Sequence, residues 1–201
     1  MNYLAHLFLS FEDKDIITGN FLGDLISNKT VKTYPEGIRK GVIIHRKIDS
    51  FTDQHPLVLQ GVRRLYAKHH KYASVLIDIF YDYMLSQNWS TYANESLQDF
   101  ANKIYAALES NTPQMSIKIQ DRVKRMVDAN WLISYQHTDG IAYAIDKVKQ
   151  RVSKPELFAN SIESLLDNYD MMNEEFNVFF PEIIGYLHKE MGVNTERPKS
   201  P

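Results

Sequence analysis

Apolar residues recur every three to four positions along most of the chain, which is the period of a helix with one buried face. No stretch alternates apolar and polar residues as a half-buried strand does. The pattern therefore predicts an all-α fold, a single-domain helical bundle of about seven to nine helices. The segments expected to be helical are residues 1–10, 15–27, 33–53, 56–70, 72–89, 90–110, 113–135, 140–152 and 157–190.

The predicted domain spans residues 1–193 and is followed by a polar tail at 194–201 that we expect to be disordered. Pro181 marks a candidate break in the last helix, because proline lacks a backbone donor and clashes with the preceding turn. In segment 113–135, the pattern predicts a buried face and an exposed basic face. The buried face contains Met115, Ile119, Val123, Met126, Val127 and Trp131, and the exposed face contains Lys118, Arg122, Lys124 and Arg125.

Four helices in the first 85 residues each carry two polar residues, four positions apart, on an otherwise apolar body. This spacing places both members of a pair on one helix face. The pairs are Asn2 and His6, Asn20 and Asp24, His45 and Asp49, and Asp78 and Asp82. A polar group inside a protein needs a partner, and four such faces meeting in a bundle predict a metal site in its core.

Each pair also has a simpler interpretation. His6 can be a core histidine with a hydrogen-bond partner, and the helix around His45 can carry only a solvated ion-pair face. Asp78 and Asp82 are harder to explain in this way, because two buried carboxylates repel each other without a cation or a shared proton. Gly19 and Gly23 line the helix of Asn20 and allow close approach of another backbone or a ligand.

Composition narrows the classes of function. The formal net charge is −2 and the pI is near 6.4, which does not suggest a nucleic-acid-binding protein. The sequence contains no cysteine, which excludes disulfides, thiolate metal sites and cysteine nucleophiles and fits a cytoplasmic protein. We expect no membrane association, since no run of 18 apolar residues and no signal peptide are present. The sequence leaves the oligomeric state open.

Several motifs in order along the chain carry a family resemblance. The chain opens with Met-Asn-Tyr-Leu-Ala-His-Leu, and Gly-Asn-Phe-Leu-Gly-Asp follows at 19–24. Residues 41–56 read Gly-x-x-x-His-Arg-x-Ile-Asp-x-Phe-Thr-Asp-x-His-Pro, and residues 78–89 read Asp-x-x-Tyr-Asp-x-x-Leu-x-x-x-Trp. With these motifs the chain resembles the acyl carrier protein phosphodiesterases, also called acyl carrier protein hydrolases.

The resemblance implies an all-helical, cytoplasmic, metal-dependent hydrolase, with Mn²⁺ as the usual metal. Its substrate would be holo-acyl carrier protein, whose phosphodiester joins 4′-phosphopantetheine to a serine. The expected products are the apo-carrier and 4′-phosphopantetheine. The family is thought to be distantly related to the HD phosphohydrolases, although this chain has no His-Asp doublet, and Tyr83 stands where family members often have histidine.

Chemistry and resemblance together suggest a role for each candidate residue. We expect His6, Asp24, His45 and Asp78 to bind the metal, since imidazole and carboxylate suit manganese, iron or zinc. Asp49 and Asp82 are expected to orient the histidines or accept a proton from water, and Arg46 to stabilise charge on the phosphoryl oxygens. Asp53 is either a helix cap or part of the site, and the role of His55 is equally open.

Two other functions remain compatible with the sequence. One is a metal-dependent phosphohydrolase acting on a small nucleotide or phosphoester, and the other is a helical binding module without catalysis. An acidic carrier protein would also need a basic surface near the site. The candidates are Arg39, Lys40, Arg63, Arg64 and Lys68, which can equally be solubilising charges. Arg63 and Arg64 cannot both face the same way on a helix, so we expect at most one of them to contact the carrier, while the other can serve an internal ion pair.

Overall fold

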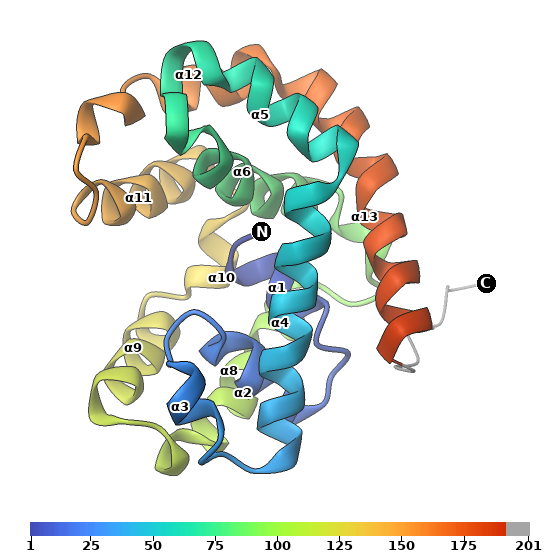
Figure 1. Ribbon diagram of the computed structural model, residues 1–201, viewed down its shortest axis with the longest axis vertical. Coiled ribbons are helices and arrows are strands. Elements are labelled where there is room, and N and C mark those ends of the chain that lie inside the picture. Colours follow the sequence, from blue (N-terminus) through green and yellow to red (C-terminus); the bar gives the residue numbers. More distant parts are fainter. Residues whose placement is uncertain (192–201) are drawn as a thin grey trace.

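The computed structural model describes residues 1–191 and is built from helices, with no strand among these residues (Figure 1). This confirms the all-α prediction. The α-helices are α1 (Tyr3–Phe8), α2 (Lys14–Leu22), α3 (Asn28–Val31), α4 (Glu36–Gln54), α5 (Pro56–His69), α6 (Ala73–Gln87), α7 (Trp89–Tyr92), α8 (Leu97–Ser110), α9 (Ile117–Asp128), α10 (Trp131–Ser134), α11 (Thr138–Lys149), α12 (Ser161–Asp167) and α13 (Tyr169–Met191). Short 3₁₀ helices are η1 (His70–Tyr72), η2 (Thr112–Gln114) and η3 (Pro155–Phe158). The predicted tail at 194–201 lies outside the described residues.

The structure has more helices than the sequence predicts, because the short α3 lies outside the predicted segments and because single residues divide some of the longer ones. Asn130, with φ 46°, separates α9 from α10, and Asn160, with φ 57°, precedes α12. Asparagine tolerates this left-handed conformation better than most residues, and a helix cannot continue through it. Pro181, in contrast, lies inside α13, which continues past it, so the expected break does not occur. The fully buried side chains of Phe180 and Ile183 on either side hold this part of the helix in the core.

Helix α4 runs through the middle of the molecule and α2 packs closely against it (Figure 1). The two helices cross where Gly19 of α2 meets Gly41 of α4. A β-carbon at Gly19 would lie 2.7 Å from the Cα atom of Gly41, so neither position has room for a side chain. The close approach expected from the glycines of α2 is therefore a contact between two backbones.

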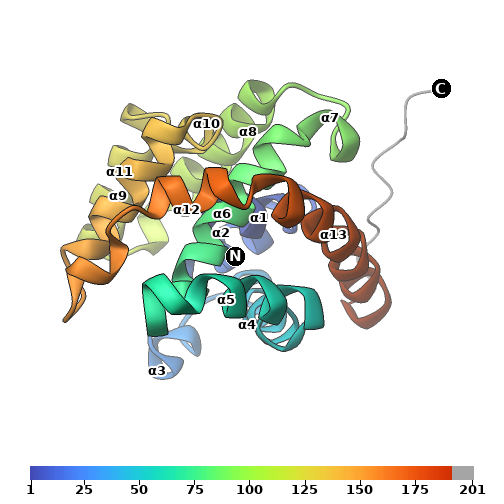
Figure 2. The same ribbon diagram turned by 90° about the horizontal axis from the view of Figure 1, so that it is seen from above.

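The short helix α1 lies near the centre of the molecule in both views, beside α4 and α6 (Figures 1 and 2). Its first turn is capped from α6, because Asp82 accepts hydrogen bonds from the backbone N–H groups of Leu4 at 2.7 Å and Ala5 at 3.1 Å. These donors have no partner within the helix. A negatively charged carboxylate at the N-terminal end also interacts favourably with the helix dipole. The cap fixes the helix that carries His6.

One cluster of buried hydrophobic side chains extends from Met1 to Leu187 and includes residues of most helices. The single domain predicted over residues 1–193 stays a prediction. Among the described residues, no helix has both the length and the apolar character needed to cross a membrane.

Candidate metal centre

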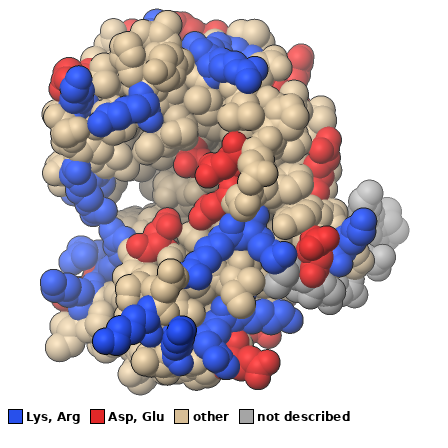
Figure 3. Space-filling model, in the orientation of Figure 1, with Lys and Arg blue, Asp and Glu red and all other residues tan. Residues whose placement is uncertain are grey.

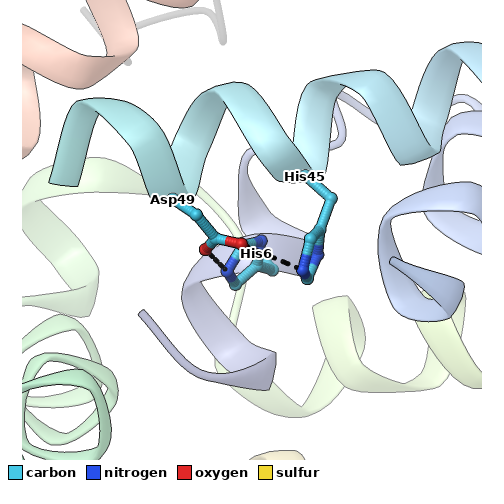
Figure 4. A group of neighbouring side chains, drawn as sticks. All are labelled: His6, His45 and Asp49. Atoms are coloured by element: carbon cyan, nitrogen blue, oxygen red, sulfur yellow. Dashed lines mark ion pairs between the residues drawn. The ribbon is translucent and has the colours of Figure 1, made fainter. Parts of the chain in front are cut away.

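His6, His45 and Asp49 form a compact group between α1 and α4 (Figure 4). One ligand atom from each residue lies within 4.8 Å of the others. His6 Nε2 is 3.1 Å from Asp49 Oδ1, and His45 Nε2 is 3.2 Å from Asp49 Oδ2. The two imidazole rings are stacked with their centroids 4.1 Å apart. The helical spacing of His45 and Asp49 therefore does bring both side chains to the face that meets α1.

Asn20 of α2 determines which nitrogen of each imidazole carries the proton. Its Nδ2 donates to the backbone carbonyl of His6 at 2.6 Å and to Ser10 Oγ at 2.9 Å, so its Oδ1 is an acceptor. That oxygen lies 2.9 Å from His6 Nδ1 and 3.1 Å from His45 Nδ1. Both Nδ1 atoms therefore donate, and in the neutral imidazoles both Nε2 lone pairs face Asp49. This is the arrangement by which an outer hydrogen-bond partner prepares histidines to bind a metal.

Asp24 completes the group from the solvent side. Its Oδ1 lies 3.2 Å from His45 Nε2, while its side chain is 83 % exposed. The sequence suggests a buried carboxylate at this position, because its neighbours are apolar. The structure differs because α2 ends at Leu22, so Asp24 leaves the buried helix face and reaches the site from the following turn.

Gly23 makes room for the imidazole of His45. A β-carbon at this position would lie 2.6 Å from His45 Nδ1. The motif Gly23-Asp24 therefore supplies both the space for a histidine and a carboxylate beside it. The glycine expected from sequence to admit a ligand instead admits the side chain of a candidate ligand.

The charges of the group are strongly coupled. Burial lowers the pKa of His45, but the carboxylates of Asp24 and Asp49 outweigh burial and raise it to about 9. Burial lowers the pKa of His6, and the nearby His45 acts in the same direction. Burial raises the pKa of Asp49, but the close contacts of its carboxylate oxygens with the two imidazoles hold this pKa well below its usual range. Near neutral pH the group thus consists of one imidazolium, one neutral imidazole and ionised carboxylates.

The donor set fits a divalent metal ion. His45 Nε2 is buried and has no partner with hydrogen-bond geometry among the described residues, although two carboxylate oxygens lie 3.2 Å away. Nitrogen and carboxylate oxygen atoms around one point, with the other imidazole nitrogens held by Asn20, are ligands suited to manganese, iron or zinc. A cavity of about 60 Å³ adjoins them. It is lined by Met1, Asn2, Tyr3, His6, Leu7, Asn20, Phe21, Asp24 and His45.

The remaining pair, Asp78 and Asp82, faces the residues that precede His6. Asp78 Oδ1 accepts a hydrogen bond from the amino group of Met1 at 2.7 Å, and Asp82 caps α1. Burial raises the pKa of Asp82 to about 7, although the backbone donors of Ala5 and Leu4 oppose this. Asp78 is not among the three residues whose ligand atoms converge. The structure thus joins members of three of the four predicted pairs at one centre, although Asn2 donates instead to the hydroxyl of Tyr135 at 3.0 Å, and the fourth pair lies against the start of the chain.

The other candidate residues lie at the margins of this group. Arg46 is exposed and donates to Asn28 Oδ1 at 2.6 Å. Asp53 is exposed at the surface, but partial desolvation of its carboxyl group and the nearby charges of Asp78 and Asp49 raise its pKa. His55 is the N-cap of α5, where its Nδ1 accepts from the backbone of Leu57, so this role belongs to His55 rather than Asp53. Tyr83 packs against the ring of Tyr169.

Two groups near the site differ from what the sequence suggests. Asn20 appears in a polar pair, but its double contact to the imidazoles depends on the packing of α2 against α4. Arg122, expected on an exposed face, donates to the hydroxyl of Tyr3 at 2.9 Å.

Among the predicted docking residues, Arg64 forms an ion pair with Glu175, which confirms that one of the two adjacent arginines pairs internally. Figure 3 shows acidic side chains at a hollow in this face and basic side chains around it.

The family model and the individual relatives that match this chain belong to the same family. The family described as acyl carrier protein phosphodiesterase matches residues 1–183. The chain is 24% identical over 185 residues to a protein of that name from Enterobacter sp. (strain 638), covering 92% of this chain and 96% of that one. It is 25% identical over 193 residues to a protein of the same name from Yersinia pestis, covering 95% of this chain and 100% of that one. No solved structure gives a significant match.

Proposed function

Because the chain belongs to the acyl carrier protein phosphodiesterase family, we propose that it is a metal-dependent hydrolase of holo-acyl carrier protein. The bond cleaved would be the phosphodiester between 4′-phosphopantetheine and the carrier serine, giving apo-carrier and 4′-phosphopantetheine. We place this reaction in the cytoplasm, as the resemblance implies. The observation that carries the proposal is the buried His45 Nε2, which faces two carboxylates without a hydrogen-bond partner among the described residues.

His6, His45 and Asp49 are the proposed ligands, and Asp24 is the fourth residue within reach. This set moves Asp49 from an outer role to direct binding. Asp78 stays a predicted ligand, although the Met1 amino group now occupies one of its oxygens. Mn²⁺ is the metal we propose, on the basis of the family resemblance and a donor set that accepts it.

When bound, a divalent ion supplies charge stabilisation for the phosphoryl oxygens and lowers the pKa of a coordinated water. The chain's own residues prepare the site for this chemistry. Asn20 accepts from both Nδ1 atoms, so both Nε2 atoms stay directed at the centre, where a metal ion would replace the proton of the charged imidazole. Asp82 holds α1, and thus His6, in place from within the core. Arg46, exposed on the helix of His45, is proposed to contact the phosphate of the docked substrate.

The test measures the mass of the carrier protein before and after incubation by mass spectrometry. Holo-carrier is incubated with the purified chain that has been treated with a chelator and then supplied with Mn²⁺, Zn²⁺ or no metal. We expect loss of the 4′-phosphopantetheine mass only when metal is present, and most strongly with Mn²⁺. His45→Ala should abolish the reaction and retain helical content by circular dichroism, while His137→Ala, an exposed histidine, should react as the unchanged chain does. Full activity of the metal-free chain or of His45→Ala would refute the proposed centre.

The same assay separates the alternatives left open by the sequence. A phosphohydrolase of small molecules would cleave a generic phosphodiester at least as well as it releases the arm of holo-carrier. A non-catalytic binding module would turn over neither substrate with any metal. Preference for holo-carrier over the generic ester supports the proposed function.

A further inference from the structure

A second, larger cavity of about 400 Å³ lies between the first residues of the chain and helices α9, α10 and α11. Four cationic residues line it, namely Arg122, Arg125, Lys147 and Arg151, and no aspartate or glutamate does. Within residues 1–191, none of these four cations forms an ion pair with a carboxylate. In a chain with net charge −2, this concentration of unpaired positive charge in one concavity favours an anionic ligand.

The cavity is adjacent to the candidate metal centre. Asn2 and Tyr3 line both it and the smaller cavity beside His6 and His45. Arg122 donates to the hydroxyl of Tyr3, so one of the four cations is held directly at the boundary between the two cavities. A ligand bound in the larger cavity can therefore extend past Tyr3 toward the centre.

Its walls also suit an organic body attached to the anion. Trp131 and Tyr135 contribute aromatic surface, and Asn2, Ser134 and Gln150 contribute neutral polar groups. The volume lies in the range of sites that hold a small organic molecule, and it is far too small for a protein. An uncharged chain that contains amides suits such walls. Its methylene groups can pack on the apolar surface, and the polar groups can supply the hydrogen-bond partners that its buried amides need.

We propose that this cavity binds the non-protein half of the substrate, a phosphate ester with an uncharged amide arm. The inference rests on the proposed function, which places that phosphate at the neighbouring centre. Arg122 at the boundary contacts the phosphate, while Arg125, Lys147 and Arg151 attract it and bind it again after hydrolysis, when it carries one more ionisable oxygen. The carrier protein remains outside. The cavity thereby selects the prosthetic arm, whereas the outer surface of this chain that docks the carrier selects the protein.

The test measures binding of 4′-phosphopantetheine to the purified full chain loaded with Mn²⁺, by isothermal calorimetry and by tryptophan fluorescence. Trp131 lines the cavity, and the only other tryptophan, Trp89, is buried elsewhere in the core, so bound probe should change a signal that Trp131→Phe removes. Pantetheine without phosphate and inorganic phosphate should each bind at least tenfold more weakly, since each lacks one half of the recognised structure.

Charge removal at the cavity supplies the second readout. Arg125→Gln and Lys147→Gln should each weaken binding of 4′-phosphopantetheine by roughly tenfold, the size of one lost charge-assisted contact. They should raise KM for holo-carrier more than they change kcat. Lys124→Gln is the matched control, because Lys124 lies on the same helix as Arg125 but outside the cavity, paired with Asp128.

Two results separate this inference from the proposed function. If the chain hydrolyses holo-carrier but Arg125→Gln and Lys147→Gln bind the probe as tightly as Lys124→Gln does, the cavity is not the arm site and the function stands. If no carrier is hydrolysed but the probe binds and both cavity variants weaken it, the anion site stands and the proposed reaction fails. Equal affinity for inorganic phosphate and 4′-phosphopantetheine would also overturn the inference, since the arm would then contribute nothing.

Discussion

Asn20 lies at the point where three helices meet, and it is the residue on which the orientation of both candidate histidines depends. Its amide oxygen accepts from two imidazoles while its amide nitrogen is held by the His6 carbonyl and Ser10. A neutral amide can do this without adding charge to a group that already contains two ionised carboxylates, Asp24 and Asp49. An aspartate at the same position would instead add another buried negative charge.

Replacement of Asn20 by alanine should therefore weaken metal binding without unfolding the chain. Loss of an outer partner of a metal-binding histidine typically costs about 10–100-fold in affinity or activity. Competition with a fluorescent chelator measures the Kd for Mn²⁺. Ser10→Ala serves as the control, because it removes one contact of Asn20 but leaves both imidazole contacts. Equal Mn²⁺ affinity in Asn20→Ala and the unchanged chain would contradict the role given to Asn20.

For single residues, the sequence shows which polar side chains lie on apolar helices. It is less informative about the residues that these side chains contact. Polar residues on apolar helices mark His6, Asn20 and His45 correctly as members of one group. The exposure of Asp24 is not predictable from its neighbours, because it depends on where α2 ends. The contact of Arg122 with Tyr3 joins residues far apart in the chain, and local periodicity contains no information about such a pair.

Between elements, the crossing of α2 and α4 has the greatest effect on the site. It brings Asn20 and Asp24 from one helix segment to His45 and Asp49 on another, and it requires the backbones to touch at Gly19 and Gly41. The glycines lower the intrinsic stability of each helix, but tertiary packing offsets this cost. The sequence shows these glycines clearly, and close approach is what they predict.

Gly19→Ala should lower the free energy of unfolding by about 1–3 kcal/mol, because the new methyl group meets backbone that cannot rotate away. Thermal denaturation followed by circular dichroism measures the change, expected at roughly 2–4 °C per kcal/mol. Gly185→Ala in α13 is the matched control, since no atom lies within 4 Å of a β-carbon there. It should be neutral or stabilise by up to about 1 kcal/mol. Equal destabilisation by both variants would mean that helix propensity, not the crossing, decides the effect.

Helix boundaries were less predictable than helix positions. The left-handed Asn130 and Asn160 divide segments that periodicity joins, because a single residue conformation leaves the apolar repeat nearly intact. Pro181 shows the opposite case, in which a strong local signal is overruled by burial of the aromatic residues around it. Local pattern and local breakers thus compete with packing energies that only the assembled fold defines.

For the molecule as a whole, the buried carboxylate of Asp82 links stability to pH. An aspartate in an unfolded chain has a pKa of about 3.9, whereas burial raises the pKa of Asp82 in the fold to about 7. Between these values the folded state binds more protons than the unfolded state. The stability that Asp82 contributes is therefore complete below about pH 4 and is lost as pH rises through about 7.

Asp82→Asn should remove this loss, since an amide does not ionise. With a chelator present, urea denaturation between pH 4.5 and 8 should show the free energy of unfolding of the unchanged chain falling relative to that of Asp82→Asn. The relative slope should be at most about 1.4 kcal/mol per pH unit. The comparison of slopes remains valid even if the variant is less stable at every pH through its weaker cap of α1. Parallel pH profiles would show that Asp82 is ionised throughout.

The two cavities draw on different parts of the chain. The four side chains grouped at the proposed metal centre, His6, Asp24, His45 and Asp49, lie within the first 49 residues, whereas the cationic wall of the larger cavity comes from residues 122–151. Mutations in the later segment can therefore change which molecule the cavity would bind without altering the residues of the proposed metal centre. For directed evolution, a library confined to residues 122–151 would explore new esters while every clone inherits the same proposed hydrolytic centre.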